Sequence, residues 1–152
     1  VRTIVTSPAP RRDAVHTRLL ATARQLSHAL LPRTRAHAEL FLDGERLEGA
    51  VPEAEPLYGP TYLARKFKIA IATPADNTPD VLANDLGLIG LFEGEHLTGW
   101  QVVIGGGMGM THTRGDTYPR LATPVAFVGP EDALRIAEAV VRLARDHGNR
   151  TD

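Results

Sequence analysis

The 152-residue sequence contains no cysteine. Disulfides, thiolate nucleophiles, zinc–thiolate sites and cysteine-ligated iron–sulfur clusters are therefore excluded within these residues. A reduced, cytoplasmic setting is compatible with this absence, and we expect that location. Serine is scarce as well, because Ser7 and Ser27 are the only two and neither lies in a nucleophile-elbow motif.

Long apolar runs and an excess of charge of one sign are also lacking. No run approaches the roughly 20 apolar residues that span a bilayer, and the first residues lack the architecture of a signal peptide. The net charge of −1 gives no general attraction to nucleic acid or to an anionic membrane. We therefore expect neither as a partner, and any basic site must be local.

The length and composition are those of one ordinary globular domain. Hydrophobic residues make up 43% and charged residues 23% of the chain, which is enough to build a core. The sequence opens on Val1 without an initiator methionine, and it ends directly after a helical pattern. We therefore expect residues 1–152 to form a single module cut from a longer chain.

Hydrophobic periodicity and turn residues predict an alternation of strands and helices. A helix begins at the Asp13 cap, carries apolar residues at spacings of three and four, and is ended by Pro32. The order indicates an α+β fold, with helices packed against a mixed, mainly antiparallel sheet. The predicted elements are strand 2–6, helix 13–31, strand 36–44, loop 45–60, strand 66–73, short helix 81–87, a hairpin over 88–106 and helix 130–147.

A cationic stretch, ARKFKIAIAT, leads into the clearest strand. Alternation along a strand places Lys66 and Lys68 on one face and Phe67 on the other. Two like charges on one face repel each other, and an anion between them would relieve the repulsion. The alternative is that both lysines are solvated edge residues that discourage aggregation, and residue type alone favours this alternative.

A glycine-rich stretch, VVIGGGMGMTH, follows the hairpin. It lacks the Gly-Lys-Ser/Thr ending of a P-loop and the third glycine of a dinucleotide fingerprint. Its backbone can approach a ligand closely or direct several N–H groups at an anion, although a simple strand-exit turn fits the spacing better. No metal site is predicted, because the six histidines lack metal-ligand spacing and the acidic set Asp76, Asp80 and Asp85 lacks the calcium-loop frame.

These stretches occur in one order that resembles the sulfite and nitrite reductase family. The matching blocks cover nearly the whole chain, and RKFK and GGGMGMTH are specific to the family. They are TSPAP before a helix, LLPRTRAHAELFLDGE, EPLYGPTYLARKFKIAIATPADNTPDVLANDLGLI, GWQVVIGGGMGMTH, TYPRLA and the terminal RDHGNRTD. One departure is Ala64, which stands where most relatives have proline before RKFK.

The resemblance implies the six-electron reduction of sulfite to sulfide, or of nitrite to ammonia, at a siroheme coupled to a [4Fe–4S] cluster. It implies that the cluster cysteines lie beyond Asp152, so the isolated 152 residues should be inactive. The electron donor stays open between an NADPH flavoprotein and ferredoxin. A non-catalytic tetrapyrrole-binding, anion-binding or structural module is the alternative. The roles implied are substrate binding for Arg2, Lys66 and Lys68, and siroheme binding for Arg65, Gly105, Gly106, Gly107, Asn149 and Arg150.

Overall fold

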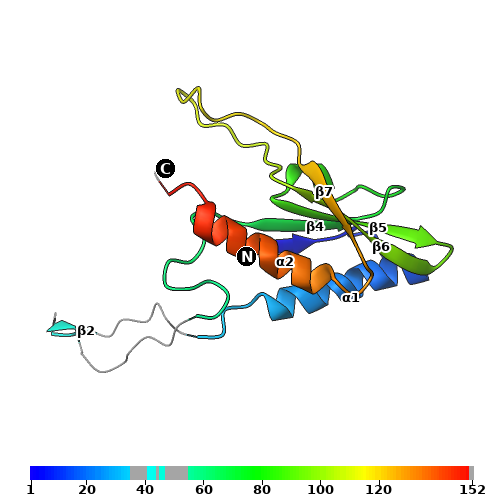
Figure 1. Cartoon of the computed structure of the whole chain (residues 1–152), viewed down its shortest axis with the longest axis horizontal. Helices are drawn as coiled ribbons and strands as arrows, with labels where there is room; N and C mark the ends of the chain where they lie inside the picture. The colour runs from blue at the N-terminus through cyan, green and yellow to red at the C-terminus, as the bar shows by residue number, and fades with distance from the viewer. Residues whose placement is uncertain (35–40, 44, 47–54, 151–152) are drawn as a thin grey trace.

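Alternating apolar strands and two amphipathic helices organise the chain into a sheet covered by helices (Figure 1). The computed structural model describes residues 1–34, 41–43, 45–46 and 55–150. The elements are β1 (Thr3–Val5), α1 (Ala14–Ala29), β2 (Phe41–Leu42), β3 (Glu45–Arg46), β4 (Lys68–Ala72), the 3₁₀ turn η1 (Val81–Ala83), β5 (Leu86–Glu93), β6 (His96–Ile104), β7 (Thr123–Val128) and α2 (Ala133–His147).

The main sheet has five strands in the order β1-β4-β5-β6-β7. The pairs β1–β4 and β4–β5 are parallel, and the longer pairs β5–β6 and β6–β7 are antiparallel. The hairpin between β5 and β6 turns at Gly94, whose φ of 60° lies in the left-handed region that glycine adopts without strain. The structure confirms the predicted α+β class with a mixed, mainly antiparallel sheet.

The two faces of the sheet have different partners. Ile69 and Ile71 of β4 are fully buried in the larger core, together with apolar residues of α1 and α2. Figure 1 shows both helices lying along this face. Ala70 and Ala72 point the other way, into a smaller cluster with Val81 and Val103. Side chains of β4 in register with Ala70 therefore emerge on the face away from the helices.

Local signals position each helix. The Asp13 side chain accepts the His16 N–H at 2.9 Å and caps α1, as the sequence predicts. The buried stripe of α2 includes Ala133 and Ala137, whose small side chains allow a close approach to the core. The fully buried Trp100 donates its indole N–H to the Pro130 carbonyl at 3.0 Å, which fixes the approach to α2.

Three local predictions need revision. Residues 81–87 do not form a helix, because only the 3₁₀ turn η1 forms and Gly87 is already inside β5. β7 was not predicted, since its Pro124 and exposed residues obscure the strand pattern, and pairing with β6 decides its conformation. Residues 45–46, predicted to begin a loop over 45–60, form β3, because they pair with β2. β2 is the end of the strand predicted over 36–44, most of which lies outside the described residues.

Candidate anion-binding site

The predicted substrate cations meet at the start of the parallel strands. Lys68 is the first residue of β4 and lies opposite Thr3 of β1. The Arg2 N–H donates to the Phe67 carbonyl at 2.8 Å, which fixes Arg2 beside the lysines. Phe67 is buried in the core, so Lys66 and Lys68 emerge on the face away from the helices, as strand alternation predicts.

These cations line one groove of about 880 Å³, which we call the anion groove. Lys66 and Lys68 are the only lysines in the chain, whereas its fifteen other cationic side chains are arginines. A general solubilising role would not confine lysine to one groove, so this distribution favours a specific site over solvated edge residues. The groove is lined by Arg2, Leu63, Ala64, Arg65, Lys66, Lys68, Asp85, Gly106, Gly107, Met108, Gly109, Met110, Thr111 and Thr117.

The glycine stretch forms the wall opposite the cations, and its glycines differ in what they require. Gly106 is buried, and a Cβ there would collide with the carbonyl oxygens of Leu82 and Asn84. Gly105 adopts a φ of 79° and donates its N–H to the Asp85 carbonyl at 2.9 Å. Gly107 has open space at its Cβ position, so its backbone is accessible from the groove. Backbone conformation thus explains Gly105, packing explains Gly106, and accessibility to a ligand applies to Gly107.

An arm, residues 107–120, continues from this wall and projects from the sheet (Figure 1). Gly107 and Arg120 exchange two backbone hydrogen bonds of 2.8 Å, which close the base of the arm. A second pocket of about 390 Å³ lies at this base and shares Arg65 and Gly107 with the anion groove. Its charged lining is mainly cationic, comprising Arg65, Arg114, Arg120, Asp85 and Asp116.

Asp85 is a site residue that the sequence analysis missed. It is half-buried, and its Oδ2 accepts the backbone N–H of Lys68 at 2.8 Å. Burial raises the pKa of the Asp85 carboxyl, while the bond from Lys68 and the positive charges of Lys68 and Arg65 oppose that rise. The sequence does place an acidic residue directly before an apolar strand. Such residues more often stabilise turns, so this pattern alone does not predict a site residue.

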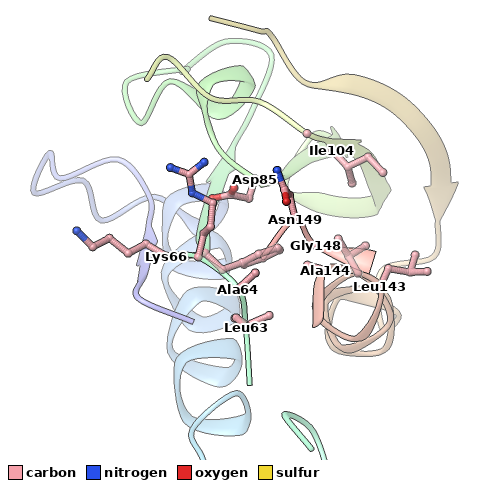
Figure 2. Close-up of a pocket in the computed structure, with 13 residues that line it drawn as sticks. Leu63, Ala64, Lys66, Asp85, Ile104, Leu143, Ala144, Gly148 and Asn149 are labelled. Carbon is pink, nitrogen blue, oxygen red and sulfur yellow. The ribbon is translucent and has the colours of Figure 1, made fainter. Parts of the chain in front are cut away.

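Asn149 and Arg150, the two cofactor residues predicted near the C-terminus, have different surroundings in the structure. Asn149 lines an apolar pocket of about 310 Å³ between α2 and the start of β4. Figure 2 shows Asn149 and Asp85 at the polar end of this pocket, with Leu143 and Ala144 on the α2 side. Arg150 lines neither this pocket nor the groove, and its guanidinium donates to the carbonyls of Thr61, Tyr62 and Arg145. Its contact with a cofactor stays a prediction.

Within residues 1–34, 41–43, 45–46 and 55–150, no group of three or more His, Asp or Glu side chains is arranged to hold a metal ion. In the same part of the chain, no helix combines the length and the hydrophobicity needed to cross a membrane.

Together, the fold and the groove define an α+β module that gathers arginine and lysine side chains beside a glycine-rich backbone. The chain belongs to the family whose model is described as the nitrite and sulphite reductase 4Fe-4S domain, which matches residues 21–152. The resemblance drawn from the sequence blocks is thereby confirmed.

Individual relatives agree with this assignment. The chain is 48% identical over 98% of its length to a sulfite reductase [NADPH] hemoprotein beta-component from Methylobacterium nodulans, and 46% identical over 99% to one from Geobacillus kaustophilus. It spans about a quarter of these relatives, 25% and 27% of their lengths. The solved NirA protein of Mycobacterium tuberculosis has the same fold, with a TM-score of 0.60 at 23% identity over 97% of this chain and 21% of that protein.

Proposed function

We propose that this chain is the part of a sulfite reductase hemoprotein that walls one side of its siroheme and substrate cavity. The full protein would reduce sulfite to sulfide in a six-electron reaction. The observation that carries the proposal is the convergence of Arg2, Lys66 and Lys68, from two neighbouring strands, on one groove beside the glycine stretch. The closely related hemoprotein beta-components support the choice of reaction.

The residues that line the groove fit a siroheme. The macrocycle carries many carboxylates, and cations outnumber acidic groups in the groove and in the pocket at the base of the arm. Leu63, Met108 and Met110 offer apolar surface for a ring, and the open backbone at Gly107 permits close approach. Of the predicted cofactor residues, Arg65 and Asn149 line these pockets and would hold carboxylates.

A bound siroheme would supply electron storage and transfer, while the protein supplies orientation and electrostatics. Arg2 would grip an oxyanion through its planar guanidinium, which stays charged at all physiological pH values. Lys66 and Lys68 would each offer three N–H donors and could pass a proton to a leaving oxygen. These side chains stabilise negative charge where the sulfur–oxygen bonds are cleaved.

The remaining components would come from outside these residues. A chain without cysteine supplies no thiolate to a [4Fe–4S] cluster, so the cluster ligands would lie elsewhere in the longer protein. An NADPH flavoprotein is the electron donor that we propose from the names of the relatives, with ferredoxin as the alternative. A cytoplasmic location stays a prediction from the sequence.

Nitrite reduction is the second candidate reaction. The family model covers both nitrite and sulphite reductases, and a groove lined by arginine and lysine would accept either oxyanion. Direct comparison of kcat/KM for sulfite and nitrite in the full-length protein would decide between them. We expect sulfite to be the better substrate.

The role of the lysines can be tested by substitution in the full-length protein. Lys66→Met and Lys68→Met each keep an unbranched side chain but remove the charge and the donors. We expect each to lower kcat/KM for sulfite at least about 100-fold, which corresponds to a loss of about 2.7 kcal/mol of transition-state stabilisation. Siroheme content, measured by absorbance, should be retained.

Arg135→Met is the matched control, because Arg135 is exposed on α2 and its nearest charged partner is Asp132. Its kcat/KM should stay within about twofold of wild type, as expected for a surface change remote from the groove. Near-normal turnover of both lysine variants would refute their role in substrate binding.

A further inference from the structure

Asp85 joins the two walls of the anion groove. Its side chain accepts the Lys68 N–H at 2.8 Å and so fastens the start of β4. Its main-chain carbonyl accepts the Gly105 N–H at 2.9 Å, and the neighbouring Asn84 carbonyl accepts the Gly106 N–H at 3.1 Å. One residue therefore links the cationic strand to the glycine stretch.

The register brings the Asp85 carboxylate beside the start of β4. Ile69 of β4 is paired with Leu86 of β5, so Lys68 and Asp85 lie at the same level of adjacent parallel strands. Asp85 directly precedes β5, whose first residue, Leu86, is fully buried toward the helices. Asp85 lines the anion groove together with Lys68, and it also lines the apolar pocket beside α2.

Among the described residues that line the groove, Asp85 is the only acidic group, and it lies among four cations. Burial raises the pKa of its carboxyl, and the Lys68 N–H and the charges of Lys68 and Arg65 oppose that rise. An ionised carboxylate repels a bound oxyanion, whereas the neighbouring cations attract it. The other charged groups facing this region are Arg2, Lys66, Arg114, Asp116 and Arg120.

We propose that Asp85 is a positioning residue that holds Lys68 at the groove and whose negative charge limits how tightly the groove binds an anion. A cage of cations alone would hold oxyanions strongly in the ground state, which does not by itself accelerate a reaction. The proposal rests on the proposed function, since it assumes that the groove serves an anionic substrate that must react and leave.

Three substitutions in the full-length protein separate position from charge. Asp85→Asn keeps the size and an oxygen that can accept the Lys68 N–H, but it removes the charge. Asp85→Glu keeps the charge, and Asp85→Ala removes both the acceptor and the charge. Asp132→Asn is the control for a general change in net charge. Asp132 directly precedes α2 and does not line the groove.

Inorganic sulfate is the probe, because its charge is constant over the neutral pH range and its binding can be measured by calorimetry without turnover. We expect Asp85→Asn to lower the sulfate Kd about three- to tenfold at low salt, with an unchanged Tm. Asp85→Glu and Asp132→Asn should stay within about twofold of wild type. Asp85→Ala should lower the Tm, because the Lys68 N–H loses its acceptor.

A tighter Kd in Asp85→Asn is an effect that structural damage would not produce. An unchanged or weakened Kd in this variant overturns the proposal, and so does the absence of sulfate binding to the wild-type groove. Failure of the wild-type protein to reduce sulfite would instead refute the proposed function, and the sulfate series would still report on Asp85.

Discussion

At the scale of single residues, small changes in position decide which side chains can serve the groove. Lys68 faces the anion groove because its neighbours Phe67 and Ile69 are buried on the opposite face of the sheet, against the helices. Gly106 is required by the carbonyl oxygens packed against it, whereas Gly109, three residues on, meets nothing within 4 Å of an added Cβ. Packing therefore requires glycine at position 106 but not at position 109 of the same sequence motif.

The two glycines make a matched pair of substitutions. Gly106→Ala should lower the free energy of unfolding by about 1–3 kcal/mol, because the new Cβ must displace the backbone of η1 or of the glycine stretch. Gly109→Ala should change it by less than about 0.5 kcal/mol, since its Cβ would enter open space. Chemical denaturation measures both, and equal losses would contradict the assigned packing role of Gly106.

At the scale of elements, a polar clamp holds β4 to α1 at the end remote from the groove. The two ring nitrogens of His16 lie 2.8 Å from the Asp13 carboxylate and 3.2 Å from the Asp76 carboxylate, so the ring bridges the two side chains. Asp76 also accepts from the Thr78 N–H and hydroxyl. Thr78 and His16 together hold the pKa of the Asp76 carboxyl well below its usual range.

This clamp predicts a loss of stability in acid. A carboxyl whose pKa is lowered by folding contributes stability above its unfolded pKa of about 3.9, and this contribution is lost as the pH falls through the folded pKa. Thermal melts of the chain should therefore show Tm falling below about pH 4. Asp76→Asn should lower the Tm at pH 7 and flatten this dependence.

Asp116→Asn is the control, because Asp116 is exposed in the arm and paired only locally with Arg114. Its Tm at neutral pH should match wild type. A wild-type pH dependence that persists unchanged in Asp76→Asn would show that other carboxyls govern acid unfolding.

At the scale of the whole molecule, one face of the sheet is covered by the two helices, and the other face carries exposed apolar side chains. The helices cover the first face, whereas Val125 and Phe127 of β7 and Met108 and Met110 of the arm are exposed. Since the chain spans about a quarter of its relatives, we infer that further residues of a longer protein complete the cavity.

The isolated chain should therefore not reduce sulfite. It carries no cysteine, so it supplies no thiolate ligand to a cluster that could pass electrons to a bound siroheme. We expect no turnover above background with a chemical reductant and little siroheme retained after gel filtration. A stoichiometric siroheme complex, detected by its absorbance, would show that this module binds the cofactor unaided.

Much of the site could be predicted from sequence, because its signals are local. Alternation alone places Lys66 and Lys68 on one face, and the family resemblance names Arg2 as their partner. Asp85 was missed because its role depends on the register of β4 against β5, which no local pattern encodes. The resemblance assigns Arg150 to the cofactor, which stays a prediction, and no local pattern encodes its hydrogen bonds to Thr61 and Tyr62, which are distant in sequence.

The Asp13 cap of α1, the alternation of β4, the lack of thiolate ligands in these residues and the family can all be read from the sequence alone. These follow from residue types and short spacings, which act within a few residues of the chain. Only the tertiary structure decided that β7 is a strand, that Arg2 reaches the lysines and that Asp85 joins the two walls of the groove. Those outcomes depend on pairing between distant strands, whose hydrogen bonds and register exist only once the sheet has formed.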